Sequence, residues 1–310
     1  MSSRATLHMV AKLHYEANMA QVEISRKLNV STATVSRLLQ KARELGIVRI
    51  EVLDLAVPEE ITDRLIAGLG LKRAAVIDTP STGVLAALAK PVGNLLRAEA
   101  LPEGSVIGIG WGRAVREVIQ AGLPAIAGVE VVALNGGLQQ SAPHFQINEF
   151  VRQAGEQLRG TAHFLHAPYF SSTRLREAFF SDPGFQETKH LWDRLDCTIV
   201  GIGFVHAPAS PASPATAGPA MLGELEIGGA VSDIIRHYVD ISGGLIPWDG
   251  EERMIAASVE QLRNARLSIG VAAAEEKAPG IVGAVRSGMI NALVTDTNTA
   301  LAVLDILEET

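Results

Sequence analysis

The hydrophobic and polar positions of this chain follow two different patterns. Up to about residue 50, apolar residues recur every three or four positions, which predicts helices separated by short breaks. Beyond residue 53, short apolar runs alternate with helical patterns such as residues 113–122, 147–158 and 299–309. The apolar runs cover residues 74–79, 105–110, 129–134, 162–167, 197–203, 267–272 and 290–296. Near-continuous apolar strands separated by helices predict an α/β body, in which helices cover both faces of a parallel sheet.

Residues 21–40 have the spacing of a helix-turn-helix. Six positions carry it: inward-facing Ile24 and Leu28, small Ser25 where the helices cross, and Asn29, Val30 and Ser31 in the turn. Asn29 suits the left-handed backbone that such a turn needs. Val30 is predicted to plug the turn, and Ser31 is a natural N-cap for the second helix.

The second helix of this motif is predicted to present a polar face to solvent. Its core positions are Val35, Leu38, Leu39 and Ala42. Arg can bind guanine, Gln can bind adenine and an Ala methyl can touch thymine, so the opposite face suits the DNA major groove. We expect DNA contacts at Ser31, Thr32, Ala33, Thr34, Ser36, Arg37, Gln40 and Lys41. The alternative is an ordinary helical hairpin with a solvated face.

The domain boundaries follow from the change of pattern. Gly46 is predicted to end the second helix, and residues 46–52 resemble a vestigial wing. We expect a helix-turn-helix domain at 1–52, a linker at 53–60 with Pro58 at a helix start, and an effector-binding domain at 61–310. One recognition helix reads few base pairs, so heads of this size bind DNA as dimers.

Composition sharpens this division. The 310 residues carry a net charge of −7, but residues 1–52 hold eight basic and four acidic residues, which leaves 19 basic and 30 acidic residues in the remainder. A basic head on an acidic body indicates that the head meets a polyanion. The single cysteine excludes an internal disulfide, and no apolar run is long enough to span a membrane. The N-terminal residues are too polar for a signal peptide, so we expect a cytoplasmic protein without cofactor or metal.

Three predicted strands end in glycine-rich turns, within residues 105–115, 131–138 and 197–204. In an open parallel sheet, ligands bind beyond the carboxyl ends of the strands. The first turn leads directly into a helix, whose free N–H groups together with Arg113 suit a phosphate. It is neither a Walker loop nor a complete dinucleotide fingerprint. The alternative is that these turns serve only tight packing.

Other candidate residues are weaker when taken singly. Asp233 follows two glycines and could accept sugar hydroxyls, while Lys277 follows a strand and could reach a phosphate; either could instead be a surface residue. His163 and His166 are predicted to face opposite sides of a strand, which makes them a poor metal pair. Cys197 begins an apolar strand and is expected to be an inert core thiol. Residues 206–220, rich in Pro, Ala and Ser, are predicted to form a loop that could act as a lid.

Taken together, these segments resemble the SorC-type bacterial transcription regulators, a sugar-binding group often placed beside the DeoR regulators. The matching pieces run in order along the chain: QVEISRKLNVSTATVSRLLQKARELGIVRI, IGIGWGRAV, VVALNGGL, FQINEFVRQAGEQL, CTIVGIG, GGAVSDI and INALVTDTNTAL. The resemblance implies an effector domain similar to ribose-phosphate isomerase and glucosamine-phosphate deaminase. It also implies a phosphorylated sugar or polyol as effector, operator DNA as partner and a homotetramer built as a dimer of dimers.

The resemblance assigns roles to individual residues. Together with the glycine turns, it predicts effector contacts at Gly110, Gly112, Arg113, Asn135, Gly136, Gln146, Asn148, Asp233 and Lys277. Three features depart from the family pattern: Thr32 replaces a residue that is often basic, Ala114 replaces a common Thr, and AAAEE replaces a glycine-rich stretch before Lys277.

The competing function is a sugar-phosphate isomerase or deaminase that uses the same body. Such chemistry needs a base near a substrate carbon and an acid opposite it. Asp233 could be the base, but no acid pairs with it at a recognisable spacing, and an isomerase has no use for residues 1–52. We therefore expect a transcription regulator rather than an enzyme.

Overall fold

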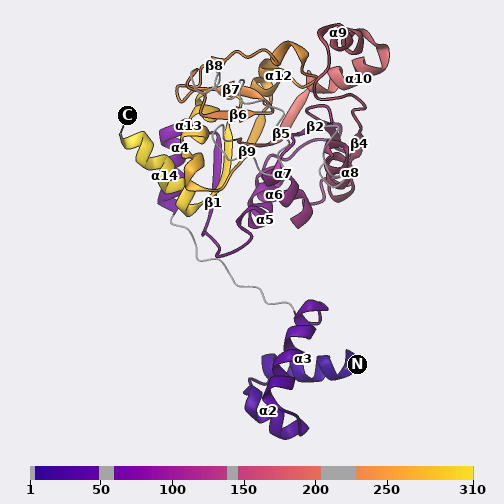
Figure 1. Cartoon of the computed structure of the whole chain (residues 1–310), viewed down its shortest axis with the longest axis vertical. Helices are drawn as coiled ribbons and strands as arrows, with labels where there is room; N and C mark the ends of the chain where they lie inside the picture. The colour runs from indigo at the N-terminus through magenta and orange to yellow at the C-terminus, as the bar shows by residue number, and fades with distance from the viewer. Residues whose placement is uncertain (1–3, 49–58, 138–145, 204–227, 310) are drawn as a thin grey trace. The chain divides into compact units, whose positions relative to one another are not determined.

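The computed structural model describes residues 4–48, 59–137, 146–203 and 228–309. The chain forms two compact units, Met1–Asp54 and Leu55–Thr310. We call them the head and the body and describe each by itself (Figure 1). The predicted loop 206–220, the residues 49–52 of the predicted wing and most of the predicted linker lie outside the described residues.

The described residues of the head form helices joined by short turns. It contains α1 (Arg4–Ala11), a π-helical turn (Lys12–Glu16), α2 (Gln21–Leu28) and α3 (Thr32–Glu44). Its core consists of apolar side chains from all three α-helices: Leu7, Val10, Ala11, Ile24, Val35, Leu38, Leu39 and Ala42. The four predicted core positions of α3 are therefore confirmed.

The turn between α2 and α3 has the predicted backbone. Asn29 adopts φ 51° and ψ 47°, and the Ser31 hydroxyl accepts a hydrogen bond from the amide of Thr34 at 3.1 Å, which caps α3. Ser25 is buried where the two helices meet. The prediction for Val30 is wrong: its side chain is 38% exposed, while Ile24 and Val35 fill the space between the helices.

The body is built on a parallel sheet of seven strands in the order β1-β10-β9-β5-β2-β3-β4. The strands are β1 (Arg73–Ile77), β2 (Val106–Ile109), β3 (Glu130–Ala133), β4 (Thr161–His163), β5 (Leu195–Gly201), β9 (Leu267–Val271) and β10 (Ala292–Asp296). Each of the seven apolar runs contributes one strand, which confirms the predicted parallel sheet.

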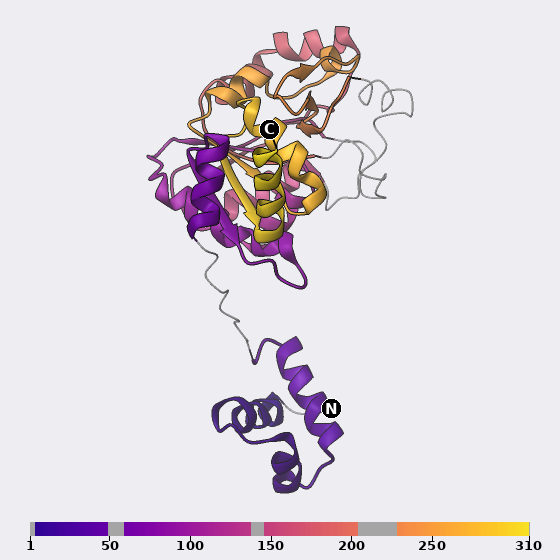
Figure 2. The ribbon, with the colours of Figure 1, turned by 90° about the vertical axis from the view of Figure 1, so that its left-hand side faces the viewer.

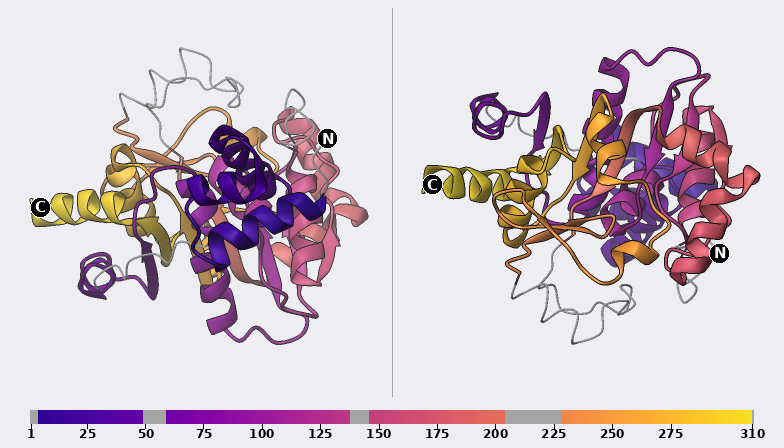
Figure 3. Two further views of the ribbon diagram at one scale, coloured as in Figure 1. Left: turned by 90° about the horizontal axis from the view of Figure 1, so that it is seen from below. Right: turned by 90° about the horizontal axis from the view of Figure 1, so that it is seen from above.

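Helices cover this sheet in two groups (Figure 1). One group is α5 (Val84–Ala87), α6 (Ala89–Ala98), α7 (Arg113–Ala121) and α8 (Ile147–Leu158); the other includes α4 (Glu59–Leu69), α12 (Val259–Asn264), α13 (Ala278–Arg286) and α14 (Thr297–Glu308). The connections from β1 to β4 run toward one edge of the sheet, and those from β5 to β10 run toward the other edge. Because such crossovers are right-handed, the two groups of helices lie on opposite faces. Figure 2 shows α14 beside α4, and Figure 3 shows α14 and the pair α9 (Thr173–Ser181) and α10 (Pro183–Trp192) at opposite ends of the sheet.

Two parts of the body differ from the sequence prediction. The run 162–167 is a strand only up to His163, because β4 is an edge strand with a single three-residue partner, and the next residue, Phe164, is exposed. A small antiparallel sheet was not predicted. Its strands are β6 (Ser232–Ile234), β7 (His237–Val239) and β8 (Leu245–Ile246), which are too short to show a period in the sequence.

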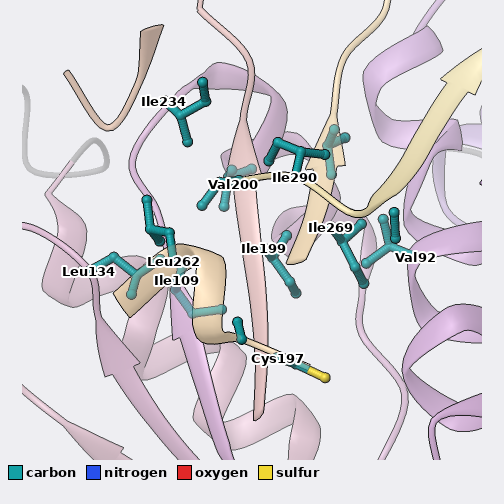
Figure 4. Close-up of a cluster of buried hydrophobic side chains, with 14 of the residues drawn as sticks. Val92, Ile109, Leu134, Cys197, Ile199, Val200, Ile234, Leu262, Ile269 and Ile290 are labelled. Atoms are coloured by element: carbon teal, nitrogen blue, oxygen red, sulfur yellow. The ribbon is translucent and has the colours of Figure 1, made fainter. Parts of the chain in front are cut away.

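The centre of the body is the predicted apolar core. Figure 4 shows Cys197, Ile199 and Val200 of β5 among side chains from neighbouring strands and helices. Burial raises the pKa of the Cys197 thiol to about 12, so the thiol is protonated and inert at neutral pH, as expected. The packed core around β5 holds the strand ends that carry the candidate site.

Candidate functional site

The exposed face of α3 is the candidate DNA-binding surface of the head. Ala33, Ser36, Arg37 and Gln40 are exposed on it, as are Ser31, Thr32 and Lys41. Thr34 is half-buried, and its hydroxyl bonds to that of Ser31 at 2.8 Å. The Gln40 amide donates a hydrogen bond to Glu44 at 3.0 Å, so this side chain is held along the helix. The helix therefore presents short polar groups and cations on one solvent-facing side.

In the body, the chain changes direction along the sheet between β2 and β5. These two strands are neighbours in the sheet. After β2 the chain continues to β3, on the side of β2 away from β5, whereas after β5 it continues to β9, on the side of β5 away from β2. We call the space beyond the carboxyl ends of β2 and β5, where the connections diverge, the candidate crevice. Crevices at such topological switch points are the usual ligand sites of open α/β sheets. Two of the three predicted glycine turns border this crevice.

The turn after β2 supplies Gly110, Gly112 and Arg113. Gly110 is buried, and a side-chain carbon there would lie 3.0 Å from Val200 and 3.3 Å from Ile235, so packing alone explains this glycine. Gly112 has φ 144° and faces open space, with no atom within 4 Å of a built Cβ. It is the N-cap of α7, and exposed Arg113 is the first residue of that helix. A helix start with an exposed arginine beside an open glycine is therefore suited to an anion.

The turn after β5 brings Asp233 and Lys277 together. The Asp233 carboxylate lies against the Cα of Gly203, where a Cβ would be only 2.4 Å from Oδ2. The Lys277 ammonium donates a hydrogen bond to the carbonyl of Ile202 at 2.8 Å. Burial lowers the pKa of Lys277; the nearby Asp233 charge opposes this effect, and the Arg113 charge adds to it. The charges of Arg113, Asp233 and Lys277 are therefore close enough to interact.

Two of the remaining predicted effector residues, Gly136 and Asn148, have packing roles within the body. A Cβ at Gly136 would lie 2.3 Å from the carbonyl oxygen of Pro168, so this position must be glycine. The Asn148 side chain is hydrogen-bonded at 3.0 and 3.1 Å to the backbone of Leu165. Gln146 is the N-cap of α8. The contacts of Gly136 and Asn148 explain these two residues without a ligand, whereas Gln146 makes no side-chain capping hydrogen bond to α8 that would explain it.

Asn135 is the exception among the residues near the end of β3. Its side chain is fully buried, and its Nδ2 donates to the carbonyl of Gly136 at 2.9 Å. Its Oδ1 has no hydrogen-bond partner within the described part of the chain. A buried acceptor of this kind costs about 1–3 kcal/mol when it stays unsatisfied, which makes Asn135 the strongest ligand candidate of this turn.

Two segments beside the crevice have backbone angles that glycine would prefer. Ala274, at φ 132°, precedes the 3₁₀ turn Glu275–Lys277. Ile235 at φ 45° and Arg236 at φ 69° join β6 to β7 in a two-residue hairpin turn. Such angles are rare for a β-branched residue, and strain of this kind clusters at functional sites. The strained segments hold Lys277 and Asp233 in place.

The hairpin also introduces residues that the sequence pattern does not reveal. Arg236 donates a hydrogen bond to the Tyr238 hydroxyl at 3.0 Å, and its charge interacts with Asp233. Burial raises the pKa of Tyr238 to about 12 and that of Tyr169 well above its usual range, so both hydroxyls stay neutral. The positive φ values of this turn draw attention to these residues in the structure. Backbone angles cannot be read from the sequence, so sequence analysis missed them.

Other features lie away from this crevice. A hollow of about 430 Å³ is lined by residues after β4 and by α9 and α10, and no predicted effector residue lines it. His163 bonds to Glu130, and the described residues contain no cluster of His, Cys, Asp and Glu that could hold a metal ion. Within the described ranges, no helix has the length and apolar character to cross a bilayer.

Comparison with known proteins agrees with this architecture. The Sugar-bind family model, a sugar-binding domain, matches residues 56–305. The chain is 32% identical to the sorbitol operon regulator of Klebsiella pneumoniae over an alignment of 308 positions, which covers 95% of this chain and 96% of that protein. This chain belongs to the SorC-type family of sugar-binding transcription regulators.

Further SorC-type relatives extend the match. The deoxyribonucleoside regulator of Bacillus subtilis (strain 168) is 28% identical over an alignment of 306 positions, which covers 96% of each chain. The crystal structure of the full-length sorbitol operon regulator SorC from Klebsiella pneumoniae has a TM-score of 0.77 and 31% identity, and the match covers 98% of this chain and 100% of that one. The mixed α/β fold with its parallel sheet is thus shared with a solved SorC-type regulator.

Proposed function

We propose that this regulator binds operator DNA through residues 1–52 and a small phosphorylated sugar or polyol through residues 61–310, joined by a linker at 53–60. The head acts as a helix-turn-helix, with α3 in the major groove. The exposed Ala33, Ser36, Arg37 and Gln40 support this role, because they form one continuous polar side of α3. Paired heads then read a two-fold repeat with half-sites one helical turn, or a multiple of it, apart.

The effector proposal rests on one observation: two cationic side chains and one carboxylate lie close enough to interact beside the carboxyl ends of β2 and β5. Arg113 at the start of α7 and the half-buried Lys277 bind the phosphate, while Asp233 accepts sugar hydroxyls. Ala114 supplies no hydroxyl, so backbone N–H groups of the open Gly112 turn take a larger share of the phosphate contacts.

The effector acts by shifting a population between two arrangements of a homotetramer. A ligand can shift such an equilibrium only through unequal affinity for the two arrangements. Binding at the crevice favours one arrangement of the bodies, and that arrangement changes the spacing of the heads on DNA. The regulator works in the cytoplasm, needs no cofactor or metal and catalyses no reaction on its effector.

A thermal-shift screen of phosphorylated sugars and polyols tests this proposal. A ligand at 100 times its Kd should add about 2.7 kcal/mol to the stability of the body. Each ligand that binds is then added to the protein–DNA complex, and to an assay for its own chemical conversion. Turnover of the ligand would favour the isomerase or deaminase alternative, and a neutral sugar that binds as well as its phosphate would contradict the phosphate site.

A further inference from the structure

Five of the described aromatic residues form one cluster beside the candidate crevice. The sequence has only three Trp and three Tyr residues. Two of each, Trp111, Trp248, Tyr169 and Tyr238, are joined there by Phe170 and Met254 in connected apolar clusters. These residues come from four separate segments of the chain, so the fold rather than local sequence brings them together.

The geometry of the aromatic cluster is well defined. The rings of Tyr169 and Phe170 are stacked at 4.8 Å, and the Trp248 ring meets Phe170 and Tyr238 edge-on at 5.8 and 5.4 Å. The Trp248 indole donates a hydrogen bond to the carbonyl of Arg236 at 3.1 Å. A Cβ at Gly250 would lie only 1.8 Å from this indole, so the glycine makes room for the ring. The orientations of these four rings are therefore set by packing within the protein.

Three of these rings, Trp111, Phe170 and Trp248, are only partly buried. Trp111 lies between Gly110 and Gly112, in the turn that opens on the crevice. Tyr169 and Tyr238 lie near enough to Asp233 for its charge to act on their hydroxyls. One end of the crevice is thus polar and charged, and an aromatic surface adjoins it.

We propose that this aromatic surface binds the C–H face of a ring-closed sugar, with Trp111 as its member in the turn after β2. The inference rests on the proposed function, since the same ligand places its phosphate near Arg113 and Lys277. Aromatic faces carry negative charge density, which attracts the weakly positive C–H groups on one side of a sugar ring. An open-chain polyol presents such a face only after several bonds are frozen, and each lost rotation weakens binding. The site therefore takes aldose or ketose phosphates in preference to polyol phosphates.

Matched ligand pairs test this proposal on the full-length protein. Aldohexose 6-phosphates and aldopentose 5-phosphates are titrated by calorimetry beside the polyol phosphates made by reducing C1 of each. In every pair that binds, we expect the ring-closed member to bind at least 10-fold more tightly. Equal or tighter binding of the polyol phosphates would overturn the inference while leaving the proposed function intact.

Variants of Trp111 separate stacking from general packing. Trp111→Leu should reduce the ring preference to less than 3-fold, whereas Trp111→Phe should retain most of it. Trp192→Phe is the matched control, because Trp192 is fully buried and donates to the carbonyl of Ala133. A ring preference that survives Trp111→Leu would overturn the role of Trp111. Phosphate-free sugars that bind as well as their phosphates would contradict the proposed function instead, and failure of every pair to bind would contradict both.

Discussion

The strained backbone at Ala274 leads to a prediction about stability. At φ 132° and ψ 132° an alanine is outside the common regions, and strain of this kind costs about 1–3 kcal/mol. Replacing Ala274 by Gly relieves the strain but increases the conformational entropy of the unfolded chain, which costs about 0.4–1 kcal/mol. The two backbone hydrogen bonds at this residue, to Thr299 and from Lys277, do not involve its side chain and remain. Ala274→Gly should therefore stabilise the body by about 1–2 kcal/mol.

Differential scanning calorimetry measures this effect directly. For a unit of this size, about 1–2 kcal/mol corresponds to a rise in Tm of roughly 2–8 °C. The neighbouring Ala273→Gly is the matched control, because Ala273 is buried and has no positive φ. That variant should lower the stability by about 1–2 kcal/mol, through the lost methyl burial and the added chain entropy. A Tm for Ala274→Gly that falls as it does for Ala273→Gly would refute the strain argument.

Three further predictions address other parts of the chain. Arg37→Ala should weaken specific DNA binding by about 1–3 kcal/mol and relax base preference at one position per half-site. Arg43 is exposed in the last turn of α3, where we expect it to contact phosphates, so Arg43→Ala should weaken binding to all sequences alike. Fluorescence anisotropy on selected and scrambled duplexes measures both effects. Because the pKa of Lys277 is lowered, the ammonium loses its charge as pH rises toward that pKa, and affinity for a phosphorylated effector should fall. Lys277→Arg should show no such fall. Lys277→Glu should lose the effector response but keep DNA binding. With a pKa of about 12, Cys197 should resist iodoacetamide at pH 8 in the folded protein and react only after unfolding, and rapid labelling of the native chain would contradict its burial.

The elements that the sequence predicted well are those with long and unambiguous patterns. The apolar run of β5 and the helix at residues 147–158 are visible because burial on one or both faces imposes a period. The hairpin between β6 and β7 is invisible to this reasoning, since each strand has only three residues. Val30 was misplaced because an apolar residue in a turn can equally well point outward, and only the packed helices show which direction it takes.

The candidate site was predictable in its parts but not in its assembly. Glycine turns after strands pointed to Gly112 and Arg113, but the adjacency of β2 and β5 comes from long-range pairing that no local pattern contains. Asn148 fits a ligand role by sequence, yet its amide is bonded to the backbone of Leu165. The aromatic surface that includes Trp111 combines four separate segments, so only the fold reveals it.

The most direct test of effector-controlled DNA binding is one titration. A duplex selected by the full-length protein from random DNA is labelled, and its Kd is measured by fluorescence anisotropy with and without the phosphorylated sugar found by screening. We predict that the effector changes this Kd by about 5-fold to 150-fold, the range typical of coupled sites, and that Lys277→Glu abolishes the change. An unchanged Kd at saturating effector, with the ligand shown to be bound, would contradict the account.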